Sequence, residues 1–155
     1  MYPQTHFLAS YLIALIFVKF GVFDYKIALF AALVGLFIDI DHFLIYAFKY
    51  KDIGLRDSWN KAVKGLYHGR SFIHHQIGFI IMTLIIISLY FYNTTLFWIL
   101  SIGYYSHMFV DYAQLNILRI REKMTIKEAG FITKINKFEV LLDISLVIGI
   151  ILLLL

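Results

Sequence analysis

Long apolar stretches, separated by short polar breaks, follow one another along almost the whole chain. The longest, residues 71–110, contains no Asp, Glu, Lys or Arg. It is apolar on all sides, as in helices surrounded by lipid, whereas a soluble helix has a single apolar stripe. A helix needs roughly 20 mostly apolar residues to cross a bilayer. We therefore predict five membrane-spanning helices, with a tight hairpin at Asn93-Thr94-Thr95: 5–20, 27–48, 72–92, 96–115 and 139–155.

Composition supports this pattern and excludes some classes of protein. Hydrophobic residues make up 61% of the chain and charged residues only 15%, less charge than soluble domains carry. We expect an all-α, polytopic transmembrane bundle forming one integral membrane domain over residues 1–155. The chain has no cysteine, so a bound metal would have to use His, Asp or Glu.

The basic residues predict an orientation in the membrane. Of the 14 Lys and Arg, six lie in the loop 49–71 and six in the loop 116–138, while the other side has only Lys19 and Lys26. The positive-inside rule then places the N-terminus and both loops in the cytoplasm and the C-terminus outside, at the cell membrane. The net charge of +4 is explained by orientation and does not indicate a nucleic-acid partner. Both loops also have amphipathic patterning, which predicts helices on the membrane surface.

Ionisable side chains occur inside the predicted spans, where they are costly and usually mark a site. Ionisable residues placed at random in helices of alternating direction would fall in both halves of the bilayer. Here every one falls in the cytoplasmic half, and His68 lies just before the third span. The set is His6, Asp39, Asp41, His42, His74, His75, His107, Asp111 and Asp143.

Helical phase separates some members of this set from others. His107 and Asp111 are four residues apart and share a helix face, as do Asp39 and His42, which are three apart. Asp41 points roughly 200° away from Asp39 on an ideal helix, so both can face one site only where the helix is irregular.

Other members have competing explanations. His74 and His75 point about 100° apart on a helix, so one of them is a neighbour rather than a ligand. His68 and His75 are as well explained by hydrogen-bonded packing. Asp143 fits an ion pair with Lys137 or a polar contact to the fourth span. The remaining residues form either a structural hydrogen-bond network or a metal site, and a divalent metal would offset the desolvation of the carboxylates.

Four short segments match the motifs of one family, in order and at similar spacing, over about residues 5–115. The sequence resembles the YdjM-like family of membrane-bound metal-dependent hydrolases. Thr5-His6 matches its early T-H, and Gly35–His42 matches G-x-x-x-D-x-D-H. Arg70 with His74 matches R-x-x-T-H, and Gly103–Asp111 matches G-x-x-S-H-x-x-x-D.

The chain departs from the family pattern near three of these motifs. Ile38 replaces the usual Pro before the first Asp. Gly69-Arg70 replaces an H-R pair, with a histidine displaced to His68. Ile73 and His75 replace the Thr before and the Ser after the motif histidine. The resemblance implies a metal-dependent hydrolase.

The predicted ligand set indicates the chemistry of the site. Histidine and carboxylate ligands without thiolate suit zinc, and also manganese or ferrous iron. The candidate metal ligands are His6, Asp39, Asp41, His42, His74, His107 and Asp111. They exceed one tetrahedral site, so a two-metal centre that hydrolyses phosphoesters is plausible.

A site within one leaflet predicts a lipid or other amphipathic phosphoester as the substrate. Asp41 or Asp111 would orient the attacking water, unless that carboxylate is a ligand instead. Arg70 beside His74 would hold the phosphate through bidentate contacts, although a snorkelling interfacial arginine explains it equally well.

Other functions remain open from the sequence. A metal-ion or proton transporter also places His and Asp in its spans, but the outer halves of these helices lack polar residues for a through-path. A zinc protease would usually contain H-E-x-x-H, which is absent. A structural scaffold has no need of such a cluster. A non-catalytic membrane module stabilised by a metal is the remaining alternative.

Overall fold

The structure is a computed structural model. It describes residues 2–40, 72–113, 124–128 and 131–155, with a few positions between 44 and 60. Its elements, in chain order, are α1 (Pro3–Lys19), α2 (Tyr25–Phe37), the 3-10 turn η1 (Phe72–His74), α5 (Gln76–Tyr92), α6 (Thr94–Tyr112), the strands β1 (Met124–Glu128) and β2 (Phe131–Ile135), and α7 (Lys137–Leu154). The predicted helical bundle is thereby confirmed.

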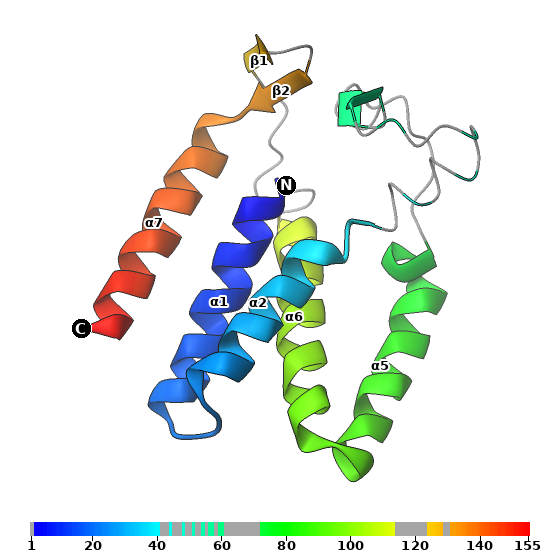
Figure 1. The fold of residues 1–155 in the computed structure, drawn as a ribbon, viewed down its shortest axis with the longest axis vertical. Helices are drawn as coiled ribbons and strands as arrows, with labels where there is room; N and C mark the ends of the chain where they lie inside the picture. The colour runs from blue at the N-terminus through cyan, green and yellow to red at the C-terminus, as the bar shows by residue number, and fades with distance from the viewer. Residues whose placement is uncertain are drawn as a thin grey trace.

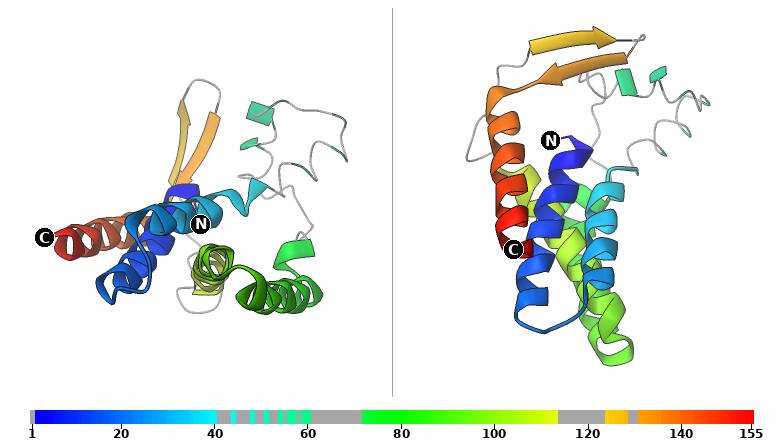
Figure 2. Two further views of the ribbon diagram at one scale, coloured as in Figure 1. Left: turned by 60° about the horizontal axis from the view of Figure 1, so that its bottom comes forward. Right: turned by 60° about the vertical axis from the view of Figure 1, so that its left-hand side comes forward.

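The helices stand side by side, and their directions alternate in chain order (Figure 1). α1, α5 and α7 start at one end of the bundle, and α2 and α6 start at the other end. α1 packs against α2, α6 and α7, and α2 also packs against α6. α5 lies at one edge of the bundle against α6, and α7 lies at the other edge against α1. The antiparallel hairpin of β1 and β2 extends beyond the helices at the end where α1 begins (Figure 2). This end of the bundle is called the hairpin end below.

Residues at the helix boundaries explain where each helix starts and stops. Asp24 and Asn93 each accept a hydrogen bond from a backbone N–H three residues on, at 3.0 Å, and so cap α2 and α6. Gly21 ends α1 with a positive φ of 72°. The Gly21 N–H donates to the Val18 carbonyl, and the Val22 N–H donates to the Phe17 carbonyl. This is the Schellman arrangement, which favours glycine.

Small side chains let the three central helices approach closely. Ala9, Ser10 and Ala14 of α1 are buried against the alanine-rich face of α2, which ends at Gly35. The Ser10 and Ser106 hydroxyls share a hydrogen bond of 2.6 Å between α1 and α6. Contacts of this kind are typical of helices packed without large side chains between them.

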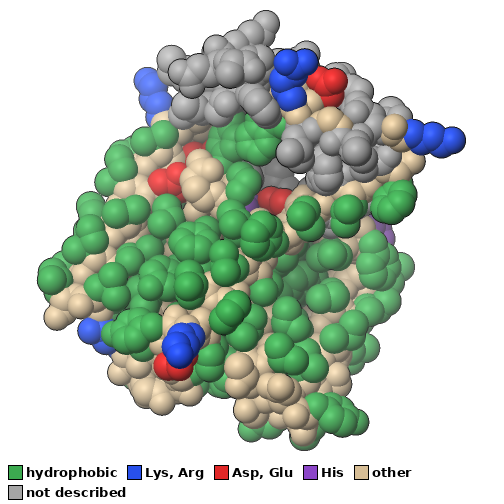
Figure 3. Space-filling view, viewed as in Figure 1, with side chains coloured by type: hydrophobic (Ala, Val, Ile, Leu, Met, Phe, Trp, Pro, Cys, Tyr) green, Lys and Arg blue, Asp and Glu red, His purple; other side chains and the backbone are tan. Residues whose placement is uncertain are grey.

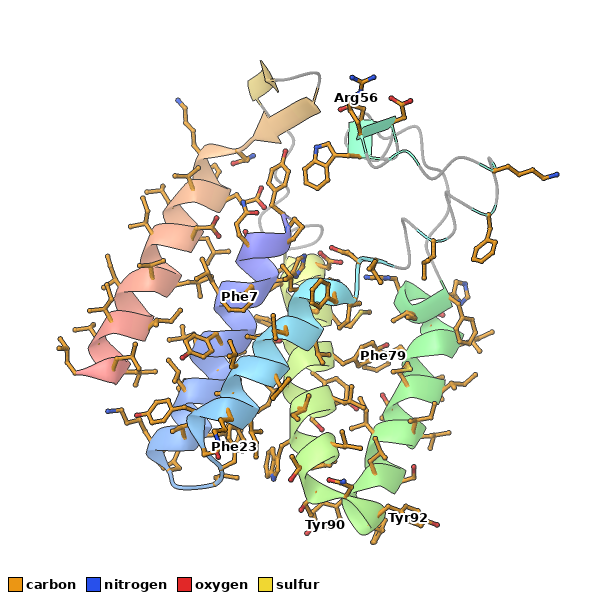
Figure 4. The ribbon with its side chains drawn as sticks, in the orientation of Figure 1. Phe7, Phe23, Arg56, Phe79, Tyr90 and Tyr92 are labelled. Atoms are coloured by element: carbon orange, nitrogen blue, oxygen red, sulfur yellow. The ribbon has the colours of Figure 1, made fainter. Side chains whose placement is uncertain are left out.

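Aromatic residues close the opposite end of the bundle. Phe17, Phe23 and Trp98 are mutual neighbours, with ring centroids 5.2–6.1 Å apart. Figure 4 shows Phe23 at the turn between α1 and α2. The polar residues of interest lie at the hairpin end, away from this cluster.

The structure corrects three predictions. α2 ends at Phe37 and a turn follows at residues 38–39, so the predicted helix 27–48 is interrupted there. Ile40, Leu44 and Phe48 are again helical, and the residues between them lie outside the described part of the chain. The region 116–138, predicted as an amphipathic helix, contains the strands β1 and β2, which the all-α prediction lacked. In the part of the chain that is described, no helix combines the length and the apolar character needed to cross a membrane. The five predicted spans are therefore not confirmed: α1, α2 and α5 have 17, 13 and 17 residues, and α7 includes Lys137, Glu139 and Asp143.

Candidate metal centre

Two histidines and two aspartates meet at the hairpin end of the bundle. α6 supplies His107 and Asp111, one helical turn apart. Asp39 follows the end of α2 by two residues, and His74 is the last residue of η1. One donor atom from each of these four residues lies within 4.8 Å of every other, close enough to hold a metal ion.

Five of the six distances between these donor atoms are close to the edges of a ligand tetrahedron, and the sixth, between Asp39 and Asp111, is within 4.8 Å. The Nε2 atoms of His74 and His107 are 3.1 Å apart. His107 Nε2 is 3.4 Å from Oδ1 of Asp39 and 3.6 Å from Oδ2 of Asp111, and His74 Nε2 is 3.6 Å from each of these oxygens. Ligands about 2.0–2.1 Å from a tetrahedral zinc lie roughly 3.3–3.4 Å from one another. The four residues therefore fit a divalent ion.

The backbone of α2 orients His107. Its Nδ1 donates to the Gly35 carbonyl at 2.8 Å, which leaves the Nε2 lone pair facing the carboxylates. Such a bond fixes the tautomer and the ring direction of a metal-binding histidine. The carbonyl comes this close because Gly35 has no side chain, since a Cβ there would collide with Ser10.

His74 is oriented through the residue before it. The Tyr104 hydroxyl donates to the Ile73 carbonyl at 3.0 Å, and Tyr104 is itself almost fully buried. The Phe79 ring stacks on it at 6.0 Å and reaches from α5 towards α6 (Figure 4). A Cβ at Gly78 would meet the Phe72 carbonyl, so this glycine lets η1 fold against the first turn of α5.

His6 of α1 closes another side of the cluster. Its ring stacks on that of His107 with centroids 3.9 Å apart. Its Nε2 lies 3.3 Å from Oδ1 of Asp111 and 3.8 Å from Oδ2 of Asp39. The residue is fully buried, and neither ring nitrogen has a hydrogen-bond partner among the described residues.

The start of α7 holds the start of α1 next to this cluster. Oε1 of Glu139 accepts hydrogen bonds from the Tyr2 N–H at 2.6 Å and from the Thr5 hydroxyl at 3.4 Å. Glu139 is 4% exposed, although the sequence offered no reason to bury it. Asp143 lies one turn further along α7, with a buried Oδ1 that has no hydrogen-bond partner in the described part of the chain.

The remaining predicted residues lie apart from the cluster or are not placed. His75 is exposed, and its Nδ1 accepts a hydrogen bond from the Ile77 N–H at 3.5 Å, at the N-terminus of α5. This cap accounts for His75 as a neighbour of the site. Asp41, His42, His68 and Arg70 lie outside the described residues.

Sequence reasoning missed the residues that orient the histidines. Gly35 and Tyr104 carry no charge. Both lie within the matched motifs, Gly35 as the glycine of G-x-x-x-D-x-D-H, but neither was assigned a role. Their proximity to the charged residues along the chain, Gly35 four before Asp39 and Tyr104 three before His107, was the available signal, because positions three or four apart share a helix face.

Comparison with known proteins identifies the family. No curated protein and no solved structure matches the chain at a significant level. The family described as YdjM inner membrane protein matches residues 1–116, a range that contains every residue of the His and Asp cluster. Since this match covers well over half of the chain, the protein belongs to the YdjM inner membrane protein family.

Proposed function

We propose that this protein is a membrane-embedded, metal-dependent hydrolase that cleaves a phosphoester of a lipid or other amphipathic substrate. The observation that carries the proposal is the convergence of one donor atom each from Asp39, His74, His107 and Asp111 to within 4.8 Å of one another. Ligands of two histidines and two carboxylates without cysteine favour zinc, with manganese or ferrous iron as alternatives.

Surface apolarity supports a membrane location. Large hydrophobic side chains are exposed along the outer faces of α5 and α7, including Leu84 at 61%, Phe91 at 78% and Leu152 at 67%. In Figure 3 hydrophobic side chains cover the middle of the molecule, and charged ones gather towards its two ends. Patches of this extent on a protein surface indicate contact with lipid or with another protein. The family description, inner membrane protein, agrees with lipid.

We further propose that the hairpin end faces the cytoplasm. Arg56 lies beyond the helices at this end (Figure 4), whereas Lys19 ends α1 and Lys26 begins α2 at the other end. The two basic loops thus support a cytoplasmic hairpin end by the positive-inside rule. Reporter fusions after residues 60 and 125 should both give the cytoplasmic signal. A periplasmic signal from either fusion would contradict this orientation.

The residues of the site then have distinct roles in hydrolysis. A divalent ion held by Asp39, His74, His107 and Asp111 would supply a water of near-neutral pKa and would polarise a phosphoryl oxygen. Asp41 orients the attacking water and takes its proton, because Asp111 serves as a metal ligand. The water oxygen bonds to phosphorus, the ester P–O bond breaks, and the proton passes to the leaving oxygen. Arg70, four residues before His74 in the chain, holds the phosphate by bidentate hydrogen bonds.

The test is hydrolysis by the purified, metal-loaded protein in detergent. A panel of lipid phosphates and soluble phosphodiesters should yield inorganic phosphate or free headgroup from at least one member, and a chelator should abolish the reaction. Asp39→Ala and His107→Ala should be inactive, Arg70→Ala should mainly raise KM, and His75→Ala should keep wild-type activity. If the whole panel stays intact while liposomes containing the protein pass metal ions, the site belongs to a transporter instead.

A further inference from the structure

The carboxylates of Asp39 and Asp111 each direct their two oxygens to different partners. Oδ1 of Asp39 and Oδ2 of Asp111 lie 3.4–3.6 Å from the Nε2 atoms of His74 and His107. The other oxygen of each carboxylate lies close to His6 Nε2, at 3.8 Å for Asp39 and 3.3 Å for Asp111. The four-residue site described above therefore uses only one oxygen of each carboxylate, and the second oxygen of each faces His6.

His6 faces these remaining oxygens without a hydrogen bond to either. Its side chain is 0% exposed, and both ring nitrogens are buried without a hydrogen-bond partner in the described part of the chain. A buried polar atom normally has a partner, since leaving it unpaired is costly. A bound cation at Nε2 would supply one.

We propose that the centre holds two divalent ions, with a second ion bound by His6 Nε2, Asp39 Oδ2 and Asp111 Oδ1. The proposal rests on the metal centre of the proposed function and adds a second site to it. The separations of 3.3 and 3.8 Å among these three atoms are close to the roughly 3.3–3.6 Å expected for oxygen and nitrogen ligands of one tetrahedral ion.

Both carboxylates would then bridge the two ions. Bridged pairs of this kind lie about 3.5–4 Å apart and act together on phosphoesters. The first ion has four ligands from the described residues, whereas the second has three. Three protein ligands leave a position open, as catalytic metal sites require. Substrate and water would then bind at the second ion.

The experiment counts ions in the full-length, detergent-purified protein loaded with Mn²⁺ alone. Elemental analysis should give two ions per chain, and electron paramagnetic resonance should show a spin-coupled pair. In His6→Asn the count should fall to one, with the six-line spectrum of isolated Mn²⁺. His75→Asn, which changes a neighbouring exposed histidine, should keep two coupled ions.

Several results would overturn the second site. The wild-type protein would saturate at one ion, or His6→Asn would keep two coupled ions, or His6→Asn would lose all of its metal. Should His6→Asn fail to fold, the wild-type count and its spin coupling decide the question alone. Neither readout depends on turnover, so two coupled ions in a protein that hydrolyses nothing would refute only the proposed function. One ion in an active enzyme would refute only the second site.

Discussion

The imidazole of His107 is held at both of its nitrogens, by the Gly35 carbonyl on one side and by the carboxylate cluster on the other. The first contact depends on the absence of a side chain at residue 35. In Gly35→Ala the new Cβ collides with Ser10, which should cost about 1–3 kcal/mol of unfolding free energy as overpacking. Displacement of the carbonyl should weaken metal binding by about 10–100-fold, as for other residues that orient a metal ligand.

Thermal unfolding and zinc titration of the variant measure these two effects. The double variant Gly35→Ala/Ser10→Gly removes the colliding side chain and should recover much of the metal affinity. Unchanged affinity in the single variant would show that this carbonyl does not position His107.

Tyr104 acts on the other histidine of the pair through one hydrogen bond. Tyr104→Phe keeps the ring contact with Phe79 and removes only the donor to the Ile73 carbonyl. This hydrogen bond contributes about 1 kcal/mol to the anchoring of η1, so its loss should weaken metal binding roughly fivefold. Competition titration measures the change in metal affinity. Tyr105→Phe is the matched control, because its hydroxyl makes no hydrogen bond to the described residues; equal effects in both variants would contradict the role of Tyr104.

Among the individual residues of the site, the sequence predicted the charged ligands and missed the uncharged residues that orient them. A carboxylate in an apolar segment is conspicuous because its burial is costly, and so Asp39 and Asp111 were recognised from position alone. Tyr104 is one of 11 tyrosines and Gly35 one of nine glycines. The packing of α2 on α6 shows that the Gly35 carbonyl contacts His107, and the packing of η1 and α5 on α6 shows that Tyr104 contacts the residue before His74.

At the scale of elements, α7 is attached to the site through the first turn of α1. Glu139→Ala leaves the Tyr2 N–H and the Thr5 hydroxyl without their acceptor, at a cost of about 1–3 kcal/mol. It should also lower metal affinity, because His6 follows Thr5 directly. Glu139→Gln keeps an acceptor oxygen and should retain most of both properties.

Chemical denaturation and metal titration of these two variants test the attachment of α7. Ser145→Ala, on an exposed part of α7 where the hydroxyl bonds only to its own helix at the Leu141 carbonyl, should leave both quantities unchanged. Glu139→Ala with wild-type metal affinity would show that α7 does not support the centre.

The helices were predicted better than the connections between them. Apolar runs, Asn93 and the absence of charge over residues 71–110 located α5 and α6 to within a few residues. The hairpin was missed because the loop 116–138 was interpreted as amphipathic and helical. The β-branched residues Thr125 and Thr133 and the Ala-Gly pair at 129–130 are the strand and turn signals that should have taken precedence.

For the whole molecule, the centre joins parts of the chain that are far apart in sequence. Its residues come from α1, the end of α2, η1 and α6. A ligand that binds only the folded state adds stability as its concentration exceeds Kd, by about 2.7 kcal/mol at a hundredfold excess. Removal of metal by a chelator should therefore lower the Tm, and zinc should restore it.

His107→Ala should start from a lower Tm and show no further loss with chelator. A Tm that is the same with and without metal in the wild-type protein would contradict binding to the folded cluster.

Asp39 and Asp111, whose carboxylates each face both proposed ions, affect the order in which ions and substrate bind. With neutral imidazoles, the five side chains His6, Asp39, His74, His107 and Asp111 carry a formal charge of −2. One divalent ion neutralises them, and a second reverses the sign to +2. A phosphate dianion is thus repelled by the empty centre and attracted by the full one. Inorganic phosphate and the second Mn²⁺ should bind with positive cooperativity, each tightening the other equally, and calorimetry at one and two ions per chain would measure it.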